Sequence, residues 1–293
     1  MTPAMAELRS GNSATPEDPS HRVFNQSGVA EYYASLNYLT PCEQLLFDEY
    51  LRPGMVILDL GVGGGRTTAH LSSIASRYVG VDYANEMIAR CRDKFPKLEF
   101  CVANTVNLSV FASSTFDAAV MAFNAIDSLI PDESRHRTLA EIRRVLKPGG
   151  VLIFSSHNPR SLWVRPSWNA QRVREVAEKA VRSDSFLFRP LLFCLTAVRV
   201  LLAGLQSSQR SLGRAARRVP TRTFWQEEGY WTDPAHGGLK IHAASPEKVA
   251  RELARLKLQL LRVLGDDYPR VSRRYVTDWY YYVFSRAGTA EEK

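Results

Sequence analysis

The chain has 293 residues, enough to bury a full core as one elaborated domain or two small ones. A hydrophobic share of 45% and a charged share of 23% are ordinary for a globular protein. The net charge of +8 does not indicate a chain-wide nucleic-acid surface, because residues 160–222 alone hold 13 Lys and Arg against three acidic residues. The basic character therefore belongs to one segment, and the remainder is slightly acidic.

The N-terminal residues 1–22 are predicted to be a flexible leader. They are rich in Ser, Pro and Gly and contain no apolar run, so no secretory signal is expected. The cysteines form no CxxC pair and show no metal-ligand spacing with histidine: Cys42, Cys91, Cys101 and Cys194. We interpret them as small buried residues in a reducing compartment, which favours a cytoplasmic location and no metal site.

Strand-like and helix-like pieces alternate from about Gly54 to Asn158, which is typical of βαβ units and a parallel sheet. Short apolar runs predict the strands, and longer amphipathic stretches predict the helices. The expected elements are, in chain order, a strand at 56–58, a helix at 66–77, a strand at 78–82, a helix at 86–95, strands at 98–102 and 116–122, a helix at 131–146 capped by Asp132 or Ser134, and a strand at 151–155.

This alternation lapses across residues 159–240, which are expected to form a largely helical insertion. It resumes where Ser245 is expected to cap a helix at 246–257, with strands at 258–264 and 279–284 completing the sheet. The sequence therefore predicts an α/β fold with a seven-stranded, mostly parallel, doubly wound sheet whose last strand is antiparallel at or near an edge. The core would comprise residues 23–158 and 241–287.

A glycine-rich loop follows the first predicted strand, at Asp59-Leu60-Gly61-Val62-Gly63-Gly64-Gly65. Alternate glycines let the backbone turn tightly and approach a ligand, and the next helix N-terminus presents free amides. A dinucleotide fingerprint would place glycine at position 66, where this chain has Arg66. A dehydrogenase is therefore a remote alternative, which binding of NAD would test.

The pattern D-x-G-x-G-x-G, met by Asp59, Gly61, Gly63 and Gly65, resembles motif I of the class I S-adenosylmethionine-dependent methyltransferases. The resemblance implies a Rossmann-like methyltransferase fold whose glycine loop holds the amino-acid end of S-adenosylmethionine. Asp82 closes the second strand, about 20 residues on, where an acid can accept hydrogen bonds from both ribose hydroxyls. The same carboxylate would repel a 2′-phosphate.

The resemblance extends to further cofactor residues. Asn104 and Thr105 follow the third strand, where the family usually has an acid that meets the adenine amino group; Asn104 departs from that pattern but has a carbonyl acceptor. Phe123 and Asn124 end the segment that looks like motif IV, beside the methionine moiety. In many relatives aromatic residues of the N-terminal helix close over the cofactor, a role expected here of Tyr33.

Methyl transfer from a sulfonium needs alignment of the acceptor with the methyl group, and an oxygen or nitrogen acceptor can also need a general base. His157 is the first candidate because it lies just past the fifth strand, although it could simply hydrogen-bond a loop. Asp127, past the fourth strand, is the second candidate, or else caps the 127–130 turn. His236 stands in turn-forming sequence that either folds over the site or makes an ordinary turn.

Within the insertion, residues 186–202 are strongly apolar but are interrupted by Arg189 and Arg199. A central arginine costs about 2.5–3.5 kcal/mol on insertion, so a membrane span is not expected. The segment is either a cap over the acceptor pocket or an interfacial helix in peripheral contact with an anionic membrane. The arginines that follow would suit phosphate groups or form a solvated face: Arg210, Arg214, Arg217 and Arg218.

Three functions remain open. The first is methyl transfer to an O or N atom of a small-molecule or lipid-linked, sugar-like acceptor. The second is an RNA methyltransferase that uses the basic insertion, although no Asn-Pro-Pro-Tyr-type motif follows the fourth strand and nucleic acid is not the expected partner. The third is a non-catalytic cofactor-binding or membrane-recruitment protein.

Overall fold

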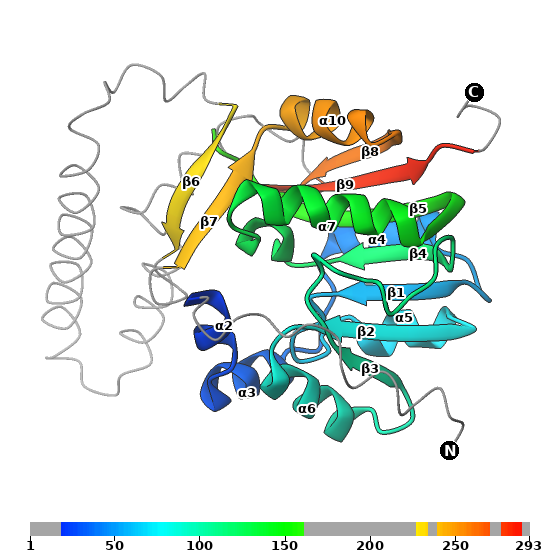
Figure 1. Cartoon of the computed structure of the whole chain (residues 1–293), viewed down its shortest axis with the longest axis vertical. Helices are drawn as coiled ribbons and strands as arrows, with labels where there is room; N and C mark the ends of the chain where they lie inside the picture. Colours follow the sequence, from blue (N-terminus) through cyan, green and yellow to red (C-terminus); the bar gives the residue numbers. More distant parts are fainter. Residues whose placement is uncertain (1–18, 161–226, 234–238, 270–276, 289–293) are drawn as a thin grey trace, which may run out of the picture.

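The computed structural model describes residues 19–160, 227–233, 239–269 and 277–288. Its main feature is a seven-stranded sheet in the order β3-β2-β1-β4-β5-β9-β8 (Figure 1). The strands are β1 (Val56–Leu60), β2 (Arg77–Asp82), β3 (Glu99–Val102), β4 (Phe116–Met121), β5 (Leu146–His157), β8 (Leu258–Gly265) and β9 (Trp279–Arg286). The first five are parallel, and β9 is antiparallel to both β5 and β8. The predicted mostly parallel sheet with an antiparallel last strand next to an edge is confirmed.

Helices cover both faces of the sheet because the buried strand residues alternate in direction. Leu58 belongs to the core beneath α7 (Asp132–Val145) and α10 (Pro246–Arg255). Its neighbour Ile57 belongs to the core beneath α4 (Pro41–Tyr50), α5 (Thr68–Ile74) and α6 (Asn85–Lys94). The sheet is therefore doubly wound, and the ligand-binding edge is expected where the parallel strands end.

Two short helices precede the sheet, α2 (Pro19–Phe24) and α3 (Ser27–Ser35), and α3 packs beside α6 (Figure 1). Helix α2 begins inside the stretch predicted as a flexible leader, so residues 19–22 are helical. Ala30 on α3 is fully buried against Ala84 and Met87, which anchors this N-terminal segment to the core. Residues 1–18 lie outside the described part.

Several helix boundaries differ from the expected ones. Helix α5 is shorter than the predicted 66–77, because Ala75 is already extended and the Ser76 N–H donates to the Met55 carbonyl. Helix α7 has Pro131 at its N-cap with no side-chain cap, so neither Asp132 nor Ser134 plays the predicted role. The predicted cap at Ser245 is confirmed, since its side chain accepts from the Lys248 N–H.

The described end of the insertion is a β-hairpin, β6 (Glu228–Asp233) paired antiparallel with β7 (Leu239–Ala244), where a helical insertion was expected. It lies across the end of the sheet near η1 (Ala125–Ser128) (Figure 1). Residues 161–226, including the apolar segment 186–202 and the arginines after it, lie outside the described ranges. Within those ranges no helix has the length and hydropathy needed to cross a bilayer.

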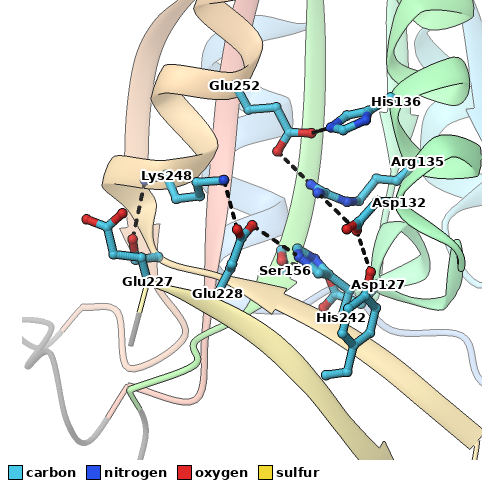
Figure 2. Close-up of polar contacts among 12 residues, drawn as sticks. Asp127, Asp132, Arg135, His136, Ser156, Glu227, Glu228, His242, Lys248 and Glu252 are labelled. Atoms are coloured by element: carbon cyan, nitrogen blue, oxygen red, sulfur yellow. Dashed lines mark hydrogen bonds and ion pairs between the residues drawn. The ribbon is translucent and has the colours of Figure 1, made fainter. Parts of the chain in front are cut away.

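A polar network ties this hairpin to α7 and α10 (Figure 2). Arg135 of α7 donates to Glu252 of α10 at 2.6 Å, and both side chains are at most 7% exposed. The Tyr230 hydroxyl of β6 donates to Asp132 at 2.5 Å. On β7, His242 is 2% exposed, and burial together with nearby Arg135 lowers its pKa. The hairpin is therefore joined to α7 by the Tyr230–Asp132 hydrogen bond and to α10 by the partly exposed ion pair between Glu228 and Lys248.

Candidate active site

The glycine loop after β1 adopts left-handed backbone conformations at three positions. The φ angles of Gly61, Gly63 and Gly65 are +64°, +55° and +81°, which side chains with a Cβ adopt only rarely. A Cβ on Gly64 would stand 2.2 Å from the Ala34 amide nitrogen, so α3 packs directly on this loop. Gly61, Gly63 and Gly65 are therefore required by the backbone conformation, and Gly64 is required because α3 lies so close to it.

Asp82 lies beside this loop at the end of β2. Its Oδ2 accepts a hydrogen bond from the Gly63 N–H at 2.9 Å, and its Oδ1 accepts from the Ala84 N–H at 2.9 Å. The side chain is 6% exposed, and burial raises its pKa. The loop and the acid are thus adjacent, as the cofactor hypothesis requires, and a carboxylate with unused lone pairs suits neutral ribose hydroxyls.

Asp59 occupies the end of β1 and is 1% exposed. Its Oδ2 accepts from the Thr67 hydroxyl at 2.7 Å and from the Tyr78 hydroxyl at 2.9 Å. Burial raises the pKa of Asp59 to about 6, although both hydrogen bonds oppose that shift. The carboxylate joins β1 to β2 and to the turn before α5, so it holds the loop in shape.

One cavity unites nearly all of the predicted cofactor residues. Its lining includes Tyr33, Asp59, Gly61, Gly63, Asp82, Asn104, Thr105, Phe123 and Asn124. Gly65 is absent from this lining: a Cβ there would stand 3.0 Å from the Phe95 ring and 3.3 Å from the Cys91 sulfur. Gly65 therefore allows α6 to pack against the loop, a structural role in place of the predicted ligand contact.

Asn104 and Thr105, which follow β3, line the cavity and already make hydrogen bonds within the protein. The Asn104 Oδ1 accepts from the Val106 N–H at 3.1 Å, and the Thr105 hydroxyl pairs with the Thr138 hydroxyl at 3.1 Å. A carbonyl oxygen has a second lone pair, so Asn104 can also accept from an adenine amino group. The departure from the family's usual acid leaves this contact chemically feasible.

The N-terminal helix supplies one aromatic wall of the cavity. Tyr33 lines it, and a Cβ on Gly63 would stand 3.8 Å from the Tyr33 ring. Phe24 also lines the cavity and meets Tyr33 edge to face, with ring centroids 6.1 Å apart. Tyr32 is 60% exposed and does not line the cavity. Of the tyrosine pair, Tyr33 is therefore the one placed to contact a nucleoside.

A strained bend follows β4. Phe123 and Asn124 have φ angles of +56° and +59°, a conformation that costs a non-glycine residue on the order of 1–2 kcal/mol. The bend is held because the Asn124 N–H donates to the Ser155 hydroxyl at 2.8 Å. Backbone strain of this kind is concentrated at ligand sites, and here it directs two side chains into the cavity wall.

Two predicted base candidates meet at the end of β5. The His157 Nδ1 lies 2.7 Å from the Asp127 Oδ2, and the backbone N–H of His157 donates to the same oxygen at 2.7 Å. The Ser156 hydroxyl donates to Asp127 Oδ1 at 2.6 Å. His157 lines the cavity, whereas Asp127 is 1% exposed and stands behind it. The two residues therefore form a pair in which Asp127 orients the imidazole.

The third base candidate, His236, lies outside the described residues. Strand β7 does reach the site, because Ile241 lines the cavity. Within the described ranges no group of three or more His, Cys, Asp or Glu side chains is arranged to hold a metal ion.

Sequence reasoning missed Arg66 as a site residue. Its guanidinium lies 4.8 Å from the centroid of the Phe123 ring and 5.4 Å from that of Tyr38. It also donates to both carboxylate oxygens of Glu43, at 2.7 Å and 2.5 Å, with both residues buried. No local pattern indicates this contact, because Glu43 lies 23 residues away in the sequence.

The sheet order, the glycine loop and the acid at the end of β2 define a domain of the Rossmann-like methyltransferase type. Residues 57–150 match the family model described as a methyltransferase domain. The tRNA (carboxymethyluridine(34)-5-O)-methyltransferase of Arabidopsis thaliana is 30% identical over 135 residues, 46% of this chain and 31% of that protein. The demethylmenaquinone methyltransferase of Beutenbergia cavernae is 32% identical over 104 residues, 36% of this chain and 41% of that protein.

Among solved structures, the fold resembles that of Burkholderia thailandensis 1,6-didemethyltoxoflavin-N1-methyltransferase. The TM-score is 0.54 at 15% identity, covering 95% of this chain and 93% of that one. The chain spans about a third to a half of the length of the curated relatives it matches. Residues 57–150 thus form a methyltransferase domain, and the fold is that of S-adenosylmethionine-dependent methyltransferases, as the motif resemblance implied.

Proposed function

We propose that this protein transfers the methyl group of S-adenosylmethionine to an oxygen or nitrogen atom of a small-molecule acceptor. The cofactor, when bound, supplies an electrophilic methyl group on a sulfonium. Asp82 would hold its ribose, Asn104 its adenine amino group, and the glycine loop from Gly61 to Gly63 its amino-acid end. Tyr33 would close over the nucleoside.

His157 is the proposed general base. When its Nδ1–H donates to Asp127, the Nε2 atom is the unprotonated nitrogen of the neutral imidazole. Asp127 then fixes the tautomer and stabilises the imidazolium that forms when Nε2 takes a proton from the acceptor. Since Asp127 also accepts from Ser156 and from the His157 backbone, the orientation of the ring is set before any acceptor binds.

The observation that carries the proposal is the position of this pair. His157 lines the same cavity as Asp82 and Gly63, so a proton acceptor and the nucleoside-binding elements share one space. Relatives support a small acceptor, because demethylmenaquinone and 1,6-didemethyltoxoflavin occur in their names. Contact with a lipid-linked acceptor or a membrane would depend on residues 161–226, outside the described part.

The test is transfer of labelled methyl from S-adenosylmethionine to fractionated metabolite extracts by wild-type protein and by His157→Gln. We expect turnover to fall about 10²- to 10⁴-fold in the variant while calorimetric affinity for S-adenosylmethionine is unchanged. His70→Gln is the matched control, since His70 stacks on Phe47 and does not line the cavity. Full activity of His157→Gln across the pH range would remove His157 as the base.

Methylation of RNA is the second candidate function, favoured by the similarity to a tRNA methyltransferase and by the basic segment 160–222. Labelled methyl recovered in bulk tRNA, together with binding that weakens steeply as salt increases, would support it. Binding of S-adenosylmethionine without transfer to any fraction would instead support a non-catalytic role.

A further inference from the structure

We propose that the acceptor is an uncharged planar ring bearing an O–H or N–H donor, held by Phe123 and Asn124 beside His157. This inference rests on the proposed function and names the substrate class of the same site. It is drawn from the shape, charge and hydrogen-bonding state of the bend after β4.

The first element is the ring of Phe123. This side chain lines the cavity and is 38% exposed, which is unusual for a phenylalanine in a cavity wall. The Arg66 guanidinium stacks over the ring at 4.8 Å from its centroid. A ring supported in this way and still exposed has surface available for an aromatic ligand, which gains from offset or edge contacts with it.

The second element is the amide of Asn124. Its Nδ2 lies 3.4 Å from the His157 Nε2, while its Oδ1 is buried and accepts no hydrogen bond. The orientation of the amide follows from the pair behind it, because an Nε2 that carries a lone pair requires the NH₂ group to face it. The carbonyl oxygen therefore faces away from His157 and has no donor among the described residues.

A buried carbonyl without a donor is unfavourable, so a ligand that supplies an O–H or N–H is strongly preferred over one that does not. The cavity wall holds this acceptor atom next to the proposed base. A ligand group that donates to the Asn124 Oδ1 lies near Nε2, and its proton passes to Nε2 when the Asn124 NH₂ group releases the Nε2 lone pair.

The third element is charge. Among the described lining residues Arg66 is the sole Lys or Arg, and both of its terminal nitrogens are engaged by Glu43. The carboxylates of Asp59 and Asp82 line the same cavity. A phosphate or carboxylate on the acceptor would find no uncommitted cation among these residues and would meet two acidic side chains.

Most of the remaining wall near the bend is apolar, which suits the face of a ring. It is formed by Met121, Ala122, Ala125, Leu129, Ile130 and Ile241, with Ser128 and Ser134 as its polar members. A sugar would bring several hydroxyls to this wall, more than these two side chains can pair, and the others would lose their hydrogen bonds to water without replacement. The chemistry of the pocket thus favours a phenol, an enol or a ring N–H compound.

The experiment measures binding of a matched series to protein saturated with S-adenosylhomocysteine, by ligand-observed NMR. The probes are 1-naphthol, decahydro-1-naphthol, 1-methoxynaphthalene and 1-naphthyl phosphate. The second removes planarity, the third removes the donor, and the fourth replaces the donor with a charged group. We expect 1-naphthol to bind about five- to tenfold more tightly than each of the others. Equal binding of the saturated, methoxylated or charged probe, or no binding of 1-naphthol, overturns the inference.

Variants assign the effect to the bend. Phe123→Leu and Asn124→Gly should each weaken binding of 1-naphthol about five- to tenfold, since the first removes the ring and the second removes the carbonyl at a backbone conformation that glycine tolerates. Tyr32→Leu and Asn107→Ala are the controls, an exposed ring and an exposed amide outside the cavity lining. Unchanged binding in both test variants, with normal thermal unfolding, overturns the assignment.

Calorimetry with S-adenosylhomocysteine alone separates the two proposals. Failure to bind it contradicts the proposed function, whereas normal binding with no preference for 1-naphthol contradicts only the inference about the acceptor.

Discussion

Asp59 and Asp82 are buried carboxylates on neighbouring strands, and their hydrogen bonds assign them different tasks. Asp59 accepts from two side-chain hydroxyls and stabilises the loop. Asp82 accepts from the Gly63 amide of the loop and from the Tyr83 and Ala84 amides after β2, which leaves a lone pair for a ligand. At the scale of single residues, both carboxylates therefore support the loop, and Asp82 is the one that the cofactor hypothesis also assigns to the ligand.

Asp82→Ala should weaken binding of S-adenosylmethionine by about 1–3 kcal/mol, because it removes the acceptor for the ribose hydroxyls and the partner of the Gly63 N–H. Isothermal titration calorimetry measures this. Asp117→Ala is the control, since Asp117 pairs with Lys147 and the Val56 N–H at the other end of the parallel strands. Unchanged affinity in Asp82→Ala would contradict this placement of the cofactor.

Asp59→Asn should alter how stability depends on pH. Burial raises the pKa of Asp59 to about 6 in the folded chain, against about 3.9 when unfolded. The folded state holds the proton more tightly, so this group makes the wild type less stable as pH rises from about 4 to about 6. The asparagine of the variant does not titrate. The free energy of unfolding of the variant minus that of the wild type should therefore increase by about 2–3 kcal/mol as pH rises over that range.

Urea denaturation at several pH values checks this expectation. Asp117→Asn provides a contrast of opposite sign, because Lys147 and the Val56 N–H lower the pKa of Asp117 despite partial burial. Its stabilising contribution is present above the unfolded pKa and is lost as pH falls. A difference between Asp59→Asn and wild type that stays constant with pH would show that Asp59 titrates normally.

At the scale of elements, the contact between α3 and the glycine loop controls the shape of the cavity. The backbone of α3 approaches Gly64 so closely that any side chain there must displace the helix. Tyr33, on the same helix, lines the cavity next to Gly63. A change at Gly64 should therefore affect both folding stability and cofactor binding.

Gly64→Ala should lower the free energy of unfolding by about 1–3 kcal/mol and weaken binding of S-adenosylmethionine, since its Cβ would lie 2.2 Å from the Ala34 nitrogen. Gly28→Ala, on α3 itself, meets no atom within 4 Å and should cause no loss. Thermal denaturation with and without ligand measures both effects. Equal melting temperatures for the two variants would contradict the proposed packing.

The elements themselves were largely predictable, and the departures have local causes. The strand 78–82 and the helix 246–257 were expected from short apolar runs and a Ser-Pro cap, signals that act within a few residues. Helix α5 ended early because Ser76 bonds to Met55, 21 residues away, which no local pattern reveals. Hairpin β6–β7 was not predicted. It overlaps residues 159–240, which were expected to form a helical insertion.

At the scale of the whole molecule, buried charges link parts of the chain that lie far apart in sequence. Arg135 and Glu252 are separated by 117 residues and join α7 to α10 (Figure 2). His136 lies 3.0 Å from the same Glu252 carboxylate. Since the hairpin docks on α7 through Tyr230 and carries Ile241 in the cavity wall, this network couples global packing to the site.

Arg135→Met should destabilise the protein by about 3–5 kcal/mol, because it leaves Glu252 buried without its main partner. The double variant Arg135→Met/Glu252→Leu should be more stable than the single variant, since no buried charge is then uncompensated. Chemical denaturation of both variants provides the comparison. A double variant less stable than Arg135→Met would show that Glu252 has sufficient partners without Arg135.

The sequence by itself determined the doubly wound sheet, the glycine loop and the acid at the end of β2, because strand periodicity and turn chemistry act over short stretches. It also determined the class of cofactor, through motifs tied to consecutive elements. The tertiary structure decided which residues lie together: His157 with Asp127, Arg66 with Glu43, and Asn124 with His157. These pairings depend on distances between residues far apart in the chain, which are set only when helices and strands pack.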